Sequence, residues 1–281
     1  MKRVSRILMV IGLVVMVLVI ILAAAGVWFV RRPWPQVKGE LAVQGLTAPV
    51  EVIRDEWGVP HIYAENEHDL FFAQGYVHAQ DRLWQMEFNR RIGSGTLSAV
   101  LGDATLDTDR FLRTVGLRRA AEKDLALLDG DTRTILEAYA AGVNAYVDTH
   151  RNRQPLEFTI LGVNPAPWTP VDTLAWGKVM AYNLCSNYDY ELLRARIIAE
   201  AGQPGAQDLL PPYPDGATVI VPAEARGYKW LRDTDPSWPT ALTSLLGSSG
   251  GGWGSNNWVV HGSRTATGKP LLADDTHLGD R

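Results

Sequence analysis

The chain has 281 residues and a formal net charge of −4, and its composition is 46% hydrophobic and 21% charged. This composition is typical of a globular protein with one large domain or two smaller ones. The single cysteine, Cys185, excludes an intrachain disulfide framework, and the six histidines lack the spacing of a zinc motif. Because residues 1–32 contribute +5 to the net charge of −4, the rest of the chain carries −9, which argues against nucleic-acid binding.

An unbroken apolar run occupies residues 7–30. Basic residues flank it on both sides, and its 24 residues exceed the roughly 20 that a helix needs to cross a bilayer. We expect residues 1–32 to form an uncleaved signal anchor that holds an exported body, periplasmic or extracellular, at the membrane. The small residues at 23–25 leave the alternative open, which is cleavage of a signal peptide and secretion of the body.

Strand patterns follow the apolar segment. Residues 40–46 and 50–54 alternate in polarity around a proline turn, which predicts a hairpin. Residues 60–64 predict a third short strand after a turn that contains Gly58.

Helical periodicity begins near Asn66. We predict that Asp69 caps a helix over 70–80. Four further helices are expected over 81–91, 109–128, 131–149 and 171–201, and the last has a polar interruption at 183–190, where a pocket would be lined. Phe158, Leu161 and Trp168 are expected in the core, whereas residues 202–252 carry no strong period and predict a connector.

The junction Gly254–Ser255 ends a glycine-rich run and precedes a short β-prone segment. Glycine permits a bent backbone in which the serine hydroxyl can attack its own preceding carbonyl and cut the chain. Taken alone, the same residues also fit a flexible linker before a strand.

Four separated blocks resemble the penicillin acylase (penicillin amidase) family of N-terminal-nucleophile hydrolases. The blocks are 54–62 (RDEWGVPHI), 73–86 (AQGYVHAQDRLWQM), 254–260 (GSNNWVV) and 263–278, which contains GKPLLA and ends in His277-Leu278. Their order and spacing cover nearly the whole chain from about residue 39.

The resemblance implies an α+β protein with a four-layer αββα sandwich. Residues 33–224 would form the mostly helical α-subunit region, 225–254 a connector or spacer, and 255–281 the start of the β subunit. Val259–Val260 and Leu271–Leu272 would belong to its first strands. Because the β subunit of that family continues for hundreds of residues, we expect the chain to be a truncated precursor that is inactive by itself.

The resemblance also implies the chemistry. The precursor would cut itself between Gly254 and Ser255, and Ser255 would then attack a carboxamide, with its own α-amino group as the base. His277 would orient the hydroxyl and help to hold the oxyanion. Asn183 and Leu184 would contribute to the acyl pocket, and Glu191 would ligate a structural calcium ion. No cofactor is expected for catalysis.

Several readings of the function remain open from the sequence. The substrate would be a small amide, such as a penicillin-like or acyl-homoserine-lactone-like molecule, and the partners would be the two subunits cut from one precursor and the membrane. The alternatives are a non-catalytic, membrane-tethered binding domain of the same fold and a peptidase-like hydrolase of acylated amino acids.

Overall fold

The computed structural model describes residues 2–184, 188–209 and 255–276 of the chain. The chain divides into two compact units, Met1–Lys178 and Val179–Arg281, and the division falls within helix α8. Helices dominate, as expected from the sequence, and the described strands form two separate hairpins. The elements in chain order are α1 (Lys2–Arg31), β1 (Glu51–Arg54), β2 (Pro60–Tyr63), α2 (Glu67–Ser94), α3 (Ser98–Leu101), η1 (Asp103–Thr105), α4 (Leu106–Val115), α5 (Leu117–Leu127), α6 (Gly130–Thr149), α7 (Leu156–Leu161), α8 (Pro170–Leu184), α9 (Tyr188–Leu209), β3 (Ser255–Val260), η3 (Gly262–Arg264) and β4 (Leu271–Thr276).

The predicted apolar helix is present as α1. Its segment Met9–Arg31 has a mean hydropathy of 3.1, so the helix is long and apolar enough to cross a membrane by length and composition. A signal sequence near an N-terminus meets the same criterion, and the anchoring role of α1 therefore stays a prediction.

The first hairpin differs from the predicted one. β1 pairs with β2 in antiparallel register, with Val52 opposite Ile62, whereas residues 40–46 form no strand. The prediction for 40–46 was wrong because this segment turns onto α2 instead of running beside β1. Gly45 has a φ of 112°, and a Cβ at this position would lie 2.6 Å from the ring of Phe72.

The beginning of α2 is also organised differently from the prediction. Asn66 is the N-cap, and its side chain accepts a hydrogen bond from the Asp69 amide at 2.8 Å. Asp69 is buried in the first turn and accepts hydrogen bonds from the amides of Thr47 and Ala48, both at 2.9 Å. Burial raises the pKa of Asp69, but hydrogen bonds from Thr47, His68 and Asn66 outweigh this and hold it well below its usual value. Asp69 therefore fastens the preceding segment to the helix and does not cap it.

Two helix breaks test the predicted boundaries. The predicted helices over 70–80 and 81–91 are one element, α2, with a kink at Arg82 (φ −140°), next to the predicted boundary. The predicted helix over 109–128 was wrong as a single element, because Gly116 (φ 79°) separates α4 from α5. The positive φ at Gly116 ends α4, a conformation that glycine adopts at little cost.

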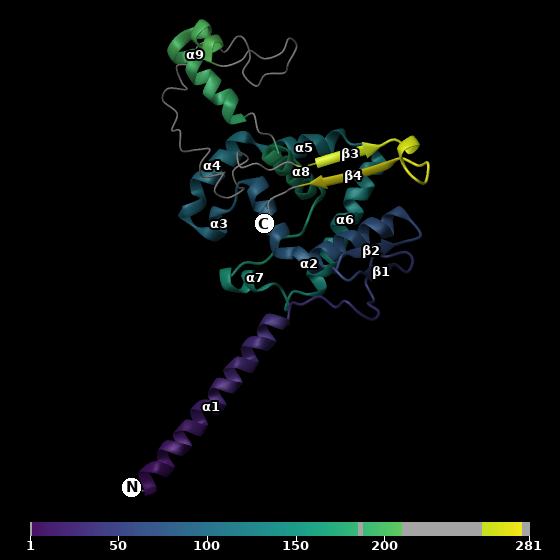
Figure 1. Ribbon diagram of the computed structural model, residues 1–281. Helices are drawn as coiled ribbons and strands as arrows, with labels where there is room; N and C mark the ends of the chain where they lie inside the picture. Colours follow the sequence, from purple (N-terminus) through teal and green to yellow (C-terminus); the bar gives the residue numbers. More distant parts are fainter. Residues whose placement is uncertain (1, 185–187, 210–254, 277–281) are drawn as a thin grey trace. The chain divides into compact units, whose positions relative to one another are not determined.

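The core of the first unit lies where α2 packs along α6 (Figure 1). Two glycines permit this close approach, since a Cβ on Gly142 would lie 1.8 Å from the Phe72 carbonyl oxygen and one on Gly75 would lie 2.1 Å from that of Tyr139. Phe158 and Trp168 are buried as predicted, whereas Leu161 is only half-buried. The helical layer is thus held by backbone-to-backbone contact as well as by apolar side chains.

The second unit contains α9 and the hairpin of β3 and β4. The predicted long helix over 171–201 corresponds to α8, which ends at Leu184, and α9, which begins at Tyr188. Residues 185–187, in the predicted polar interruption, lie outside the described residues. Helix α9 continues to Leu209 past a kink at Gly202 (φ 71°), so the prediction of irregular chain from residue 202 was wrong for 202–209. The predicted spacer, 225–254, lies outside the described residues.

Candidate active site

Ser255 is the first residue of β3, which pairs with β4 in antiparallel register. The register places Ser255 opposite Thr276 at one end of the hairpin and Val260 opposite Leu271 at the other. The predicted strand residues Val259–Val260 and Leu271–Leu272 therefore pair with one another. His277 follows Thr276 directly in the sequence, but His277 and Gly254 both lie outside the described residues.

The loop of this hairpin is built by its own polar groups. The Nδ1 atom of His261 accepts a hydrogen bond from the Ser263 amide at 3.2 Å, and the Thr265 hydroxyl donates to the Lys269 carbonyl at 2.7 Å. A Cβ on the buried Gly262 would lie 2.3 Å from the Gly268 carbonyl oxygen, so the turn requires glycine. His261 thus has a structural role in the loop. The loop sets the register in which β3 and β4 pair.

The side chains of the hairpin are largely exposed to solvent. Trp258 and Val259 on β3 and Leu271 and Leu272 on β4 are all exposed, with Leu272 at 74%. A two-stranded hairpin is only marginally stable by itself in water, and apolar strands of this kind normally pack against further elements.

The other predicted site residues lie at the end of α8 and near the beginning of α9. Asn183 is half-buried and Leu184 is 60% exposed at the end of α8, so both side chains are accessible to a ligand. Glu191, in the first turn of α9, is buried with 5% exposure instead of being solvated. Their predicted roles in the acyl pocket and in calcium binding remain predictions.

Among the described residues, Glu191 does not belong to a group of carboxylates that could hold calcium. Calcium takes six to eight oxygen ligands, usually with several carboxylates among them. In residues 2–184, 188–209 and 255–276, no three His, Cys, Asp or Glu side chains are grouped so that they could hold a metal ion. We therefore derive no step of the chemistry from a metal at Glu191.

His78 is exposed at the edge of the contact between α2 and α6. Its Nδ1 atom lies 3.0 Å from the Tyr139 hydroxyl across the contact between α2 and α6. Burial lowers the pKa of His78, which the Asp81 carboxylate offsets only in part, and burial raises the pKa of Tyr139 to about 12. Both pKa shifts favour the neutral form of the group.

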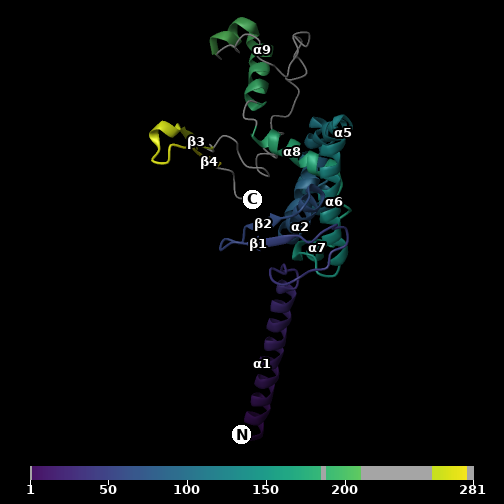
Figure 2. The same cartoon turned by 90° about the vertical axis from the view of Figure 1, so that its right-hand side faces the viewer.

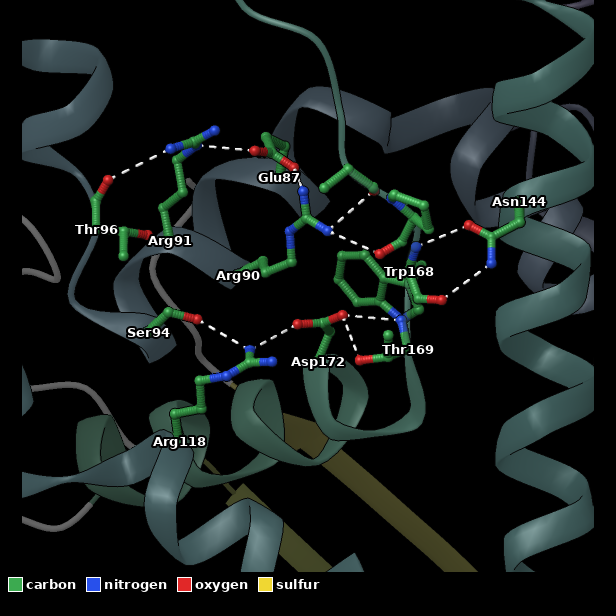
Figure 3. Close-up of polar contacts among 12 residues, drawn as sticks. Glu87, Arg90, Arg91, Ser94, Thr96, Arg118, Asn144, Trp168, Thr169 and Asp172 are labelled. Carbon is green, nitrogen blue, oxygen red and sulfur yellow. Dashed lines mark hydrogen bonds and ion pairs between the residues drawn. The ribbon is translucent and has the colours of Figure 1, made fainter.

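A polar network fixes the beginning of α8, the helix that ends at Asn183 and Leu184 (Figure 3). Asp172 accepts hydrogen bonds from the amide and hydroxyl of Thr169, at 2.8 and 2.7 Å. It also forms an ion pair with Arg118 at 2.8 Å. The same Arg118 guanidinium donates to the Ser94 hydroxyl at 3.1 Å. The start of α8 is thereby tied to α2 and α5.

A second cluster holds the loop before α8. The buried carboxylate of Glu87 pairs with Arg90 and, at 2.8 Å, with Arg91. Arg90 also donates to the carbonyl oxygens of Ala166 and Pro167, at 3.0 and 3.2 Å, and its guanidinium lies 5.7 Å from the ring centre of Trp168 (Figure 3). Because each buried charge has a partner, the cluster is satisfied without solvent.

These positioning residues were not among those predicted from the sequence. One signal was available, since Thr169-Pro170-Val171-Asp172 has the pattern of a capping box with proline at the first helical position. No local pattern marks the pairs of Arg118 with Asp172 or of Arg90 with residues 166–167, because these contacts join positions 54 and 76–77 residues apart in the sequence.

Comparison with known proteins identifies relatives for most of the chain. Residues 49–280 match the family described as penicillin amidase. A penicillin acylase 2 proenzyme from Pseudomonas sp. (strain SE83) is 37% identical over 251 residues, which cover 86% of this chain and 32% of the relative. The acyl-homoserine lactone acylase QuiP from Pseudomonas aeruginosa is 34% identical over 255 residues, or 87% of this chain and 29% of the relative. The chain therefore spans about a third of the length of these relatives.

A solved structure extends the likeness to the fold. The thermostable penicillin G acylase from Alcaligenes faecalis aligns with a TM-score of 0.50 at 34% sequence identity. The alignment covers 62% of this chain and 97% of the matched chain.

Proposed function

The chain belongs to the penicillin amidase family, and we propose that the whole protein is an acylase that hydrolyses a carboxamide with Ser255 as its nucleophile. The observation that supports this most directly is the position of Ser255. It is the first residue of β3, it follows Gly254, and the family match continues through this junction to residue 280. A relative named a proenzyme supports a precursor that is cut to become active.

The proposed activation is a cut at the Gly254–Ser255 bond. The Ser255 hydroxyl adds to the Gly254 carbonyl carbon, and the peptide C–N bond breaks as the acyl group moves to oxygen. Water then hydrolyses this ester, which leaves a carboxylate on Gly254 and a free α-amino group on Ser255. The boundary divides an α subunit, in which we place residues 33–224 and the spacer 225–254, from a β subunit that begins at residue 255.

The new α-amino group would serve as the catalytic base. Its reference pKa is about 7.7–8.0, so a useful fraction is neutral near physiological pH. The amine takes the hydroxyl proton, directly or through one water, while the Ser255 oxygen attacks the substrate carbonyl. The proton then passes to the leaving amine, and water hydrolyses the acyl-enzyme to release the acid and the free serine hydroxyl.

The register of the hairpin supports a role for His277 beside the nucleophile. Thr276 stands opposite Ser255, and paired Cα atoms in antiparallel strands lie about 4.5–5.5 Å apart. His277 is the next residue after Thr276 in the sequence. We propose that its side chain orients the hydroxyl and that its amide contributes to the oxyanion hole.

The relatives and the accessible end of α8 support the substrate class that we propose. Relatives are named as penicillin acylase and as acyl-homoserine lactone acylase, and both names denote enzymes that act on amides of an acyl group. We propose that Asn183 and Leu184, half-buried and exposed respectively, contact this acyl group. We further propose that α1 holds the exported body at the membrane.

A panel of acyl amides tests the function. The whole protein is incubated with penicillin G, with acyl-homoserine lactones of increasing chain length and with acylated amino acids, and release of the free amine is measured. We expect turnover of at least one of the first two classes, and its loss in Ser255→Ala. Turnover of acylated amino acids alone would favour a peptidase-like enzyme, and no turnover of any class would contradict the proposal.

A further inference from the structure

A cavity of about 400 Å³ lies in the first unit, between the end of α1 and the segment around α7. Figure 2 shows the end of α1 beside α7, in agreement with Figure 1. The buried ring of Phe158 contributes apolar surface, and the remaining lining is mainly polar. The polar lining residues are Arg32, Arg151, Asn152, Gln154, Thr159 and Asn164.

The ionisable side chains that line this cavity are both cationic. Arg32 lies beyond the last turn of α1, where its guanidinium stacks 5.4 Å from the ring centre of Trp28. Arg151 follows α6 and donates one hydrogen bond to Asp148 at 2.7 Å. This is an exposed ion pair of little strength, and it occupies one of the five N–H donors of the guanidinium. Two permanently charged guanidinium groups beside amide and hydroxyl groups suit a phosphate, because each guanidinium can bind it through two parallel hydrogen bonds.

The position of the cavity along α1 matches the level of lipid headgroups. The apolar segment Met9–Arg31 has 23 residues, which span about 34 Å as a helix against about 30 Å of hydrocarbon in a bilayer. Arg32, the next residue, would therefore lie at the boundary of the hydrocarbon. Trp28 and Trp34 lie on either side of it, and tryptophan is enriched at this level of a membrane.

We propose that this cavity binds the phosphodiester headgroup of an anionic phospholipid, such as phosphatidylglycerol, from the adjacent leaflet. The net negative charge of the phosphatidylglycerol headgroup distinguishes it from phosphatidylcholine. In phosphatidylcholine the ammonium group cancels the charge of the phosphate and would be repelled by the two arginines. The inference rests on α1 remaining attached and in the membrane, and it does not depend on amidase activity. Its consequence is a body seated on the bilayer surface through a second contact besides α1.

The experiment uses the full chain in lipid nanodiscs that contain equal amounts of phosphatidylglycerol and phosphatidylcholine. Lipids retained by the released protein are counted by native mass spectrometry. We expect phosphatidylglycerol to be retained in preference, and the preference to fall about tenfold or more in the double variant Arg32→Gln/Arg151→Gln, since hydrogen bonds to charged groups are among the stronger ones. The matched control is Arg153→Gln, which removes an exposed charge that does not line the cavity.

Each other outcome would overturn the inference. Equal retention of phosphatidylglycerol by the double variant and the wild type would exclude the cavity as the binding site. An equal loss of the preference in Arg153→Gln would show that general surface charge causes it. Displacement of the lipid by millimolar inorganic phosphate, with the same occupancy in discs of phosphatidylcholine alone, would identify free phosphate as the ligand. Recovery of a soluble product without α1 from cells would remove the premise.

Discussion

The helical layer of the first unit and the hairpin that begins at Ser255 differ in what holds them. The helical layer buries its apolar side chains, and its interior carboxylates Asp69, Glu87, Asp109 and Asp172 all accept hydrogen bonds or ion pairs. The hairpin has a fixed register and a loop built by its own polar groups, but its apolar side chains are exposed.

This difference shows what each region can supply to catalysis. The hairpin sets which residue stands opposite Ser255. Its apolar side chains at Trp258, Val259, Leu271 and Leu272 are exposed. An acyl-transfer site requires oriented oxyanion donors and the exclusion of water. For the proposed nucleophile Ser255, these would come from elements that pack on the hairpin.

The largest loss of stability is expected where the backbones of α2 and α6 are in close contact. Gly142→Ala places a Cβ against the Phe72 carbonyl, a backbone group that cannot move aside without separating α6 from α2. We expect the free energy of unfolding to fall by about 3 kcal/mol, at the upper end of the usual range for overpacking. Urea unfolding followed by circular dichroism measures it. The matched control is Gly130→Ala in the same helix, where a Cβ meets nothing within 4 Å and should change stability little.

A comparable loss is expected from the buried charges of the layer. Glu87→Gln leaves Arg90 and Arg91 without their carboxylate partner in a site where Glu87 is only 2% exposed. Breaking such a pair typically costs about 3 kcal/mol or more. Asp107→Asn, which removes an exposed pair with Arg110, should cost less than about 1 kcal/mol in the same assay. Equal effects of the two substitutions would show that the Glu87 cluster does not carry the stability assigned to it.

Asp69 gives the layer a dependence on pH. Its folded-state pKa lies below its unfolded value of about 3.9, so its contribution to stability is complete above this value and is lost as the pH falls through the folded pKa. We expect Asp69→Asn to be less stable than the wild type at neutral pH, with a gap that narrows below about pH 4. Thermal unfolding across this pH range measures the gap, and a gap that does not change with pH would contradict the assignment.

The smallest effect is expected in the hairpin. Leu272→Thr replaces a side chain that is 74% exposed with a β-branched residue that also favours strands. The unfolding free energy of the chain should change by less than about 0.5 kcal/mol, as is usual for surface positions. A loss above about 1 kcal/mol would show that this face is already covered, and the contrast with the helical layer would fail.

The sequence predicted what depends on local pattern or on the family motifs. Apolar periodicity located the helices on either side of Arg82, and the family resemblance indicated strand residues that lie in β3 and β4, although it did not predict their pairing. It missed what depends on distant partners. Asp69 has the sequence signature of a helix cap, yet its carboxylate accepts hydrogen bonds from the amides of Thr47 and Ala48. These bonds hold the preceding segment against α2, where the predicted strand over 40–46 does not form. The break at Gly116 depends on a positive φ that the periodicity on either side does not reveal.

The candidate site shows the same division. The Gly254–Ser255 junction, Asn183, Leu184 and Glu191 came from motifs and from resemblance to a family, and the relatives support that family. The burial of Glu191 and the contacts of Asp172 with Thr169 and Arg118 became visible only in the folded chain. A carboxylate that positions a helix through a remote arginine has no distinctive sequence neighbourhood.

The most direct test of the central claim is the intact mass of the whole protein after expression, compared with that of Ser255→Ala. The account predicts a product that begins at Ser255 in the wild type and a chain that remains uncut at this bond in the variant. A wild-type chain that stays uncut at Gly254–Ser255, or a variant that is still cut there, would contradict it.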